Sequence, residues 1–137
     1  MENGKSDFAG ALQWLRQAAE GGLLRAQLDL GGICFAGGEG QAVDIPQAFE
    51  WFTKAAAQGS KEAEVFLGII QYEGLNGAKN VASAMTHWRN AANAGIADAQ
   101  YRLGRVLAQS AETRKEGVEW LSKASSAVPQ AAPALGN

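Results

Sequence analysis

Few side chains in this sequence are suited to chemistry, because it holds a single cysteine, Cys34, and a single histidine, His87. A thiol activated by an imidazole is an effective nucleophile, but the two side chains must lie within hydrogen-bond distance. The repeated pattern described below separates Cys34 from His87 by about one and a half units of a linear stack. We therefore expect Cys34 to face the core, and both residues to pack or be partly exposed rather than form a catalytic pair.

Other motifs for chemistry are incomplete. Gly4-Lys5-Ser6 matches the end of a phosphate-binding loop, but that loop needs an earlier glycine and a preceding strand, and Met1 leaves room for neither. The sequence contains no Ser-x-x-Lys motif and no cluster with metal-ligand spacing. The sequence predicts no catalytic residue, no metal site and no cofactor, and a hydrolase stays only a remote alternative.

The main feature of the chain is a tandem repeat. The stretch from Trp51 to Gly68 is echoed upstream and downstream, and the equivalent alanines Ala18, Ala55, Ala91 and Ala124 are separated by 37, 36 and 33 residues. A period in this range is typical of a solenoid, in which stacked units bury a shared core between neighbours.

The copies follow the pattern Ala-x-Ala-Gln-x-x-Leu-Gly, a Gly-rich loop, and Asp-x-x-x-Ala-x-x-Trp-aromatic-x-Lys-Ala-Ala-x-x-Gly, with single positions replaced in each copy, such as Asn80 for Asp and His87 for Trp in the third. This pattern resembles the Sel1-like repeat, a relative of the tetratricopeptide repeat, over nearly the whole chain. The resemblance implies an all-α fold, a right-handed superhelical α/α solenoid of about three and a half repeats and about seven antiparallel helices, which binds other proteins and has no catalytic apparatus. Some members of the family are cysteine-rich and disulfide-bonded, whereas this chain has one cysteine.

The array is expected to span residues 1–128, followed by an irregular tail at 129–137. Its units are a half repeat at 6–22, repeats at 24–58 and 61–95, and a divergent terminal repeat at 96–127. The helices are predicted at 6–21, 24–36, 44–58, 61–73, 80–94, 96–109 and 113–127. Asp7, Asp44 and Asn80 each precede an apolar-periodic segment and are predicted N-caps.

Packing between the helices is expected to combine small and large side chains. Alanines at the repeated positions let the helix axes approach each other, while Trp14, Trp51 and Trp120 fill the wider gaps. His87 stands where the other copies have tryptophan, and Trp88 follows it.

Composition restricts the partners and the compartment. The net charge of −2 and the pI of 5.4 provide no basic stripe, so nucleic acid is not an expected partner. The longest apolar run, Val65 to Ile70, is too short for membrane insertion. Met1 to Phe8 lacks the features of a secretory signal, so we expect a cytoplasmic protein, or a periplasmic one if a leader has been removed.

A binding surface is predicted on the first helix of each unit. The recurring residues occupy one arc of the helical wheel: Ala26, Gln27, Leu30, Gly31, Ile33 and Cys34. The second arc is not specified by the repeat, and in tetratricopeptide relatives the corresponding helix lines the concave surface. The predicted partner-binding residues are Phe35, Val65, Phe66, Ile69, Tyr72, Tyr101, Arg102 and Arg105. The alternative is that these residues pack against a neighbouring repeat or a second copy.

The predicted function is a non-enzymatic protein–protein interaction module that binds a protein partner on its concave face. One specific role is a scaffold or adaptor in a bacterial signalling or envelope complex. The other is an immunity protein that neutralises a secreted antibacterial effector such as a lipase. Homodimer formation through exposed terminal repeats is also open, because terminal faces stack unless they are polar.

Overall fold

The structure is a computed structural model and describes residues 4–38 and 40–127. This part of the chain forms seven helices: α1 (Gly4–Glu20), α2 (Leu24–Ala36), α3 (Ile45–Ala57), α4 (Lys61–Glu73), α5 (Val81–Asn93), α6 (Ala97–Ala108) and α7 (Arg114–Ala127). Their positions follow the predicted ones, and only α1 begins earlier than expected, at Gly4. The predicted tail at 129–137 lies outside the described residues.

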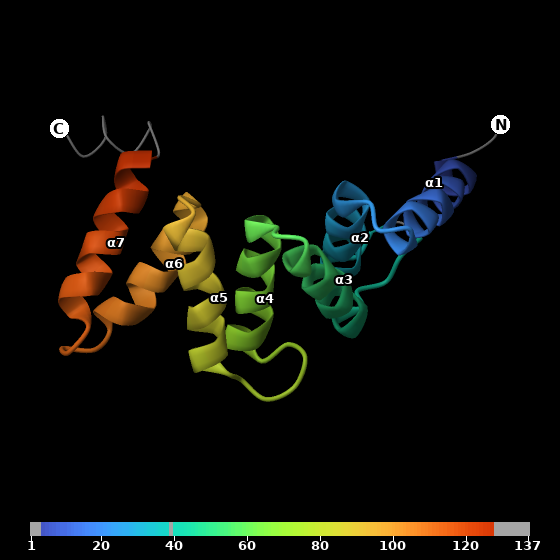
Figure 1. The fold of residues 1–137 in the computed structure, drawn as a ribbon. Helices are drawn as coiled ribbons and strands as arrows, with labels where there is room; N and C mark the ends of the chain where they lie inside the picture. Colours follow the sequence, from blue (N-terminus) through green and yellow to red (C-terminus); the bar gives the residue numbers. More distant parts are fainter. Residues whose placement is uncertain (1–3, 39, 128–137) are drawn as a thin grey trace.

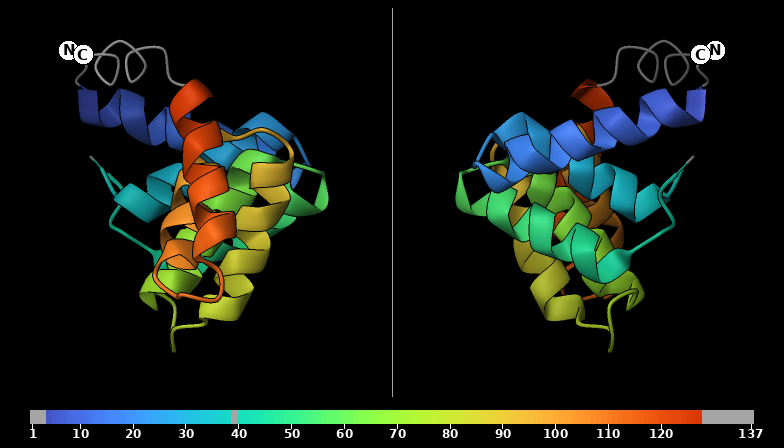
Figure 2. Two further views of the ribbon diagram at one scale, coloured as in Figure 1. Left: turned by 90° about the vertical axis from the view of Figure 1, so that its left-hand side faces the viewer. Right: turned by 90° about the vertical axis from the view of Figure 1, so that its right-hand side faces the viewer.

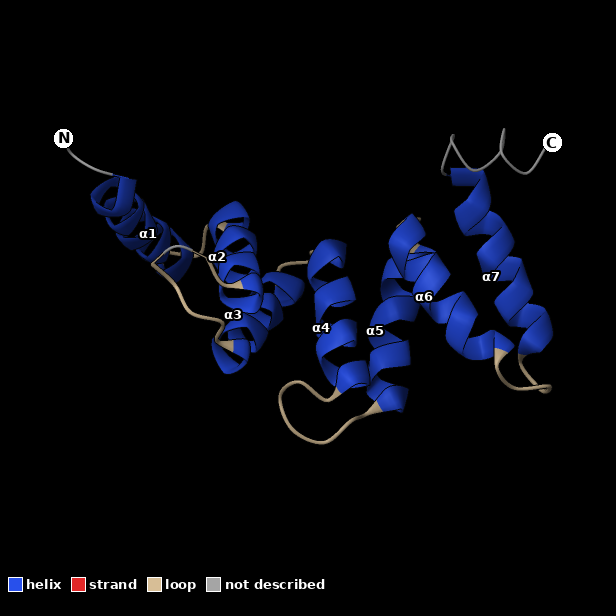
Figure 3. Ribbon diagram, turned by 180° about the vertical axis from the view of Figure 1, so that it is seen from behind, coloured by secondary structure: helices blue, strands red, loops and turns tan. Residues whose placement is uncertain are grey.

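The helices stand in one row from α1 to α7, joined by loops (Figure 1 and Figure 3). Each helix packs mainly against its neighbours in sequence, as expected for a repeat array. Figure 2 views this row from its two ends, with α7 nearest in one view and α1 nearest in the other. The predicted all-α solenoid is confirmed. Within the described residues, no helix combines the length and the apolar character needed to cross a bilayer.

The helix starts are determined by capping side chains. The Asp44 carboxylate accepts a hydrogen bond from the backbone of Gln47 at 3.1 Å, and Asn80 caps α5 in the same way. Ser60 caps α4, which the sequence analysis did not identify. The predicted cap at Asp7 is wrong, because α1 already begins at Gly4 and Asp7 lies inside it.

The recurring Leu-Gly dipeptide has a packing cause. Each of these glycines lies where the next helix places a large side chain directly against the backbone, so a Cβ atom there would collide with it. The pairs are Gly31 with Phe52, Gly68 with Trp88, and Gly104 with Leu121. The Trp88 indole N–H also donates a hydrogen bond to the carbonyl of Val65 at 3.1 Å, which fixes α5 against α4.

The apolar core consists of two clusters that meet at α4. Ala63, Leu67 and Ile70 belong to the cluster on the α1 side, whereas Val65 belongs to the cluster on the α7 side. Helix α4 is therefore buried on two sides, which explains why it carries apolar residues on two of its faces.

The predicted packing role of the tryptophans is correct for Trp51, which is 8% exposed, and for Trp120, which is partly buried. It is wrong for Trp14, which is 72% exposed. The residue at the same repeat position in α5, His87, packs on the preceding helix of its own pair. Among the described residues, no such helix precedes α1, so Trp14 has no equivalent surface to cover it.

Candidate partner-binding groove

One face of the array, formed mainly by α2, α4 and α6, is hollowed along its length. A hollow of about 540 Å³ lies between α1, α2 and α4, and a second of about 600 Å³ lies between α2, α4 and the start of α6. The third, of about 150 Å³, lies between α4 and α6. The first two share Glu62 and Phe66, and the last two share Ile69 and Arg102, so they form one continuous groove.

The central hollow has an apolar wall made of fixed rings and aliphatic side chains. Phe66 stacks on the buried Phe52 with ring centroids 4.5 Å apart, and Phe35 meets Phe66 edge-on at 5.5 Å. Val65 and Ile69 from α4 complete this wall. Because the rings pack on the core beneath them, the shape of this wall is set by the packing of the repeats.

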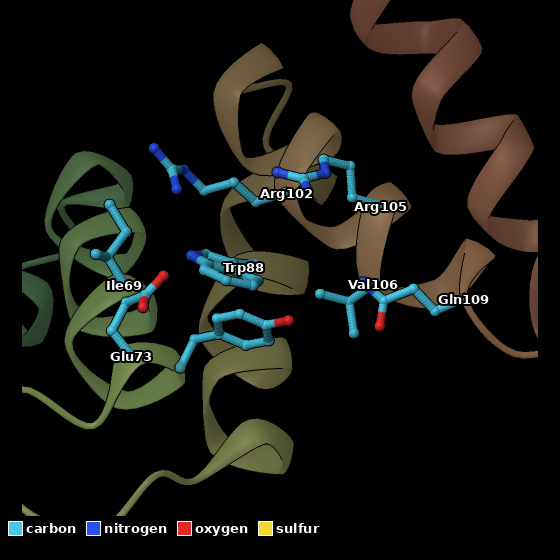
Figure 4. Close-up of a pocket in the computed structure, with 8 residues that line it drawn as sticks. Ile69, Glu73, Trp88, Arg102, Arg105, Val106 and Gln109 are labelled. Carbon is cyan, nitrogen blue, oxygen red and sulfur yellow. The ribbon is translucent and has the colours of Figure 1, made fainter.

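The hollow between α4 and α6 has a cationic rim (Figure 4). Trp88 lies between the two helices, and the Tyr72 ring packs on it with centroids 5.3 Å apart. The Nε of Arg102 donates a hydrogen bond to Asp98 at 2.8 Å, while the guanidinium of Arg105 lies 5.6 Å from the ring centroid of Tyr101.

The structure brings seven of the eight predicted binding residues into the central and α4–α6 hollows: Phe35, Val65, Phe66, Ile69, Tyr72, Arg102 and Arg105. Tyr101 does not line any of the three hollows; it is 49% exposed and supports the Arg105 side chain. That a partner binds these residues stays a prediction.

Several of these side chains also pack against a neighbouring repeat, which was the alternative to partner binding. Val65 is only 5% exposed and belongs to the core. Phe35 and Phe66 pack against the first cluster, and Ile69 and Tyr72 against the second. Except for Val65, the apolar residues that were predicted to bind a partner and line these hollows are therefore half-buried, with one side in the core and the other facing the hollow.

The end of the groove beside α1 was not predicted from the sequence. Leu15, Leu28 and Ile33 line that hollow, although Ile33 belongs to the arc of residues that recur in each repeat. A helical wheel of α2 alone does not show which neighbouring helix covers Ile33, so its place in the hollow could not be predicted from the sequence. Leu28 lies outside the arc of recurring residues, and its apolar character there was the available signal.

The two side chains considered for catalysis lie in different environments. The Cys34 thiol is fully buried in α2, with Sγ 3.7 Å from Oε1 of Gln47, and burial raises its pKa. The Nδ1 of His87 lies 2.6 Å from Oε1 of Glu64. The structure does not bring these two candidates together. Among the described residues, no group of three His, Cys, Asp or Glu side chains is arranged to hold a metal ion.

The chain is similar to proteins built from the same repeat. The model of the Sel1 repeat matches residues 2–23, 24–60, 61–96 and 97–127. No curated protein matches the chain. The crystal structure of c5321, a protective antigen present in uropathogenic Escherichia coli strains displaying an SLR fold, is 32% identical, with a TM-score of 0.82 over 93% of this chain and 28% of that one. A Sel1 repeat protein from Oxalobacter formigenes is 26% identical, with a TM-score of 0.75 over 85% of this chain and 49% of that one.

The present chain thus spans less than half the length of either solved structure. Four consecutive matches to the repeat model cover the chain almost from end to end, in register with the helix pairs of the structure. The chain belongs to the Sel1 repeat family.

Proposed function

We propose that the groove binds a segment of a protein partner, and that the chain acts as a scaffold or adaptor in a bacterial signalling or envelope complex. Sel1 repeats are generally protein–protein interaction scaffolds and are typically non-enzymatic, which supports the general role. The observation that carries the proposal is the row of three connected hollows whose apolar walls are held by the core.

The groove has the properties of an interaction hot spot. Aromatic and arginine side chains dominate binding free energy where they lie in well-packed pockets. The central hollow combines Phe35, Phe66 and Ile69 with Arg102 at its rim. Since the phenylalanine rings are already packed in the free protein, little side-chain entropy is lost when a partner binds.

The test is affinity capture with the wild-type chain as bait, followed by calorimetry with the purified partner. Ile69→Glu places a charge in two of the three hollows and is expected to weaken binding about thirtyfold or more, the effect of losing a hot-spot residue. Val118→Glu, at a 54% exposed position of α7 outside the groove, is the matched control and should bind normally. Unchanged affinity of a folded Ile69→Glu variant would refute the groove as the site.

The affinity of the captured complex also separates the two specific roles. An immunity protein must neutralise its effector nearly stoichiometrically, so it requires a dissociation constant of about 1 nM or below. This value corresponds to a binding free energy of about 12 kcal/mol. A scaffold functions at micromolar affinity. Homodimer formation through the exposed α1 face, where Trp14 lies, stays a prediction that sedimentation over a concentration series tests.

A further inference from the structure

The rim of the α4–α6 hollow carries one arginine, Arg105, that has no ion-pair partner among the described residues. Arg105 is exposed, and no carboxylate of a described residue forms an ion pair with it; its guanidinium instead lies over the ring of Tyr101. Arg102 uses its Nε for Asp98, and its two terminal nitrogens form no side-chain hydrogen bond with another described residue. Glu73 is the only acidic side chain among the residues that line this hollow, and it forms no ion pair with either arginine.

Figure 4 shows how these charges are placed around the apolar part of the hollow. Arg102 and Arg105 come from α6 and lie along one side of it, whereas Glu73 comes from α4 on the other. Trp88 lies between them. Low-dielectric walls strengthen the attraction of such a rim for an anion.

The size of the hollow limits what enters it. A cavity of about 150 Å³ holds a molecule of about the size of benzene, and this hollow has about that volume. It therefore accommodates one short side chain. The central hollow, at about 600 Å³, is larger and mainly apolar, and the two are adjacent because Ile69 and Arg102 line both.

The other end of the groove does not select charge in the same way. Asp29 and Glu62 line the hollow next to α1, but Arg25 lies 3.4 Å and 3.7 Å from their carboxylates. This single cation offsets only one of the two carboxylates, so this end of the groove stays acidic. The arginine of the groove that has no carboxylate partner among the described residues, Arg105, lies at the opposite end, and a basic side chain placed there would be repelled.

We infer that the partner segment carries a carboxylate side chain next to a large apolar side chain, with the carboxylate bound by Arg105 and Arg102 and the apolar side chain filling the central hollow. This inference rests on the proposed function and specifies the chemistry that the groove recognises. Arginine binds carboxylates through directional, charge-assisted hydrogen bonds, and the adjacent aromatic wall provides the apolar contact.

The experiment uses a phage-displayed library of random linear peptides selected on the full chain, with affinities of selected peptides measured by fluorescence polarisation. We expect the selected sequences to share an Asp or Glu beside an aromatic or branched aliphatic residue. Arg105→Gln should weaken their binding about tenfold, which corresponds to about 1.4 kcal/mol, whereas Lys115→Gln, an exposed charge on α7, should not. Replacing the peptide carboxylate by its amide should cause a similar loss in the wild type and little further loss in Arg105→Gln.

The inference is refuted if the selected peptides lack acidic residues, if no peptide is enriched, or if the amide peptide loses equal affinity in the wild type and in Arg105→Gln. The Ile69→Glu variant separates this result from failure of the proposed function. If a peptide binds Ile69→Glu more weakly but keeps its affinity when its carboxylate is replaced by the amide, the groove remains the proposed site. Only its preference for an acidic side chain would then be overturned. Peptides whose affinity is changed neither by Ile69→Glu nor by replacement of their carboxylate would overturn both the acidic specificity and the groove as the binding site.

Discussion

Replacing Gly68 by alanine tests whether the repeated glycine is required by packing between helices. A Cβ atom at Gly68 would overlap the indole of Trp88, which is 2% exposed and has little room to move. The indole also donates a hydrogen bond to Val65, so a displaced ring would strain or break that bond. The substitution should separate α5 from α4 and destabilise the array.

The expected size follows from three contributions. Overpacking a well-filled core costs about 1–3 kcal/mol of stability. Loss of a hydrogen bond costs about 0.5–1.5 kcal/mol more. Alanine is favoured over glycine within a helix by about 1 kcal/mol, which partly offsets these costs. We therefore expect Gly68→Ala to lower the free energy of unfolding by roughly 1–3 kcal/mol.

Gly32→Ala is the matched control, because Gly32 also lies within a helix but has open space at its Cβ position. This variant should be more stable than the wild type by up to about 1 kcal/mol, from helix propensity alone. Urea unfolding followed by circular dichroism and by tryptophan fluorescence measures both variants. The reasoning is wrong if Gly68→Ala is as stable as Gly32→Ala, or if both substitutions shift the unfolding midpoint in the same direction.

Three further predictions concern polar and reactive groups. A double-mutant cycle with Glu64→Gln and His87→Gln, followed by urea unfolding at neutral pH, tests the hydrogen bond between these two side chains. The coupling free energy should be about 1.5–3 kcal/mol, the range for a hydrogen bond to a charged group, and additive effects of the two substitutions would contradict this. Hydrogen bonds from Arg89 and then from Trp120 lower the pKa of Glu116, so its stabilising contribution is present above the ordinary glutamate pKa of about 4.3 and is lost as the pH falls below it. Glu116→Gln should therefore lose less stability than the wild type between neutral pH and about pH 3, and equal losses in urea midpoints would refute the link. The buried Cys34 thiol, whose pKa is raised, should react with a disulfide reagent only on unfolding, and rapid modification of the native chain would show that α2 opens.

The sequence was sufficient to predict the helices because local signals and the repeat agree. Asp44 and Asn80 mark helix starts, and glycines such as Gly59 and Gly95 adopt the left-handed backbone conformation after helix ends. The repeat then assigns the same geometry to less distinct segments. Agreement between local signals and the global pattern is what lets such a sequence specify one fold.

The errors occur in α1, before which the described residues include no other helix. Asp7 matches the capping position of the other units, but α1 extends past it to Gly4. Trp14 matches the buried Trp51, yet it is exposed because the described chain provides no preceding helix to cover it. A repeat position predicts the environment of a side chain only when both adjacent helices are present.

The groove could be predicted only in part, for a related reason. Val65, Phe66, Ile69 and Tyr72 were predicted either to bind a partner or to pack against a neighbouring repeat, and the structure shows that these side chains pack in the core and also line the groove. Phe66 stacks on Phe52 in the core and also lines the central hollow. The rigidity of the proposed binding surface is therefore a consequence of repeat packing. It follows that substitutions at Arg105, which is exposed and outside both clusters, separate recognition from stability better than any apolar residue of the groove.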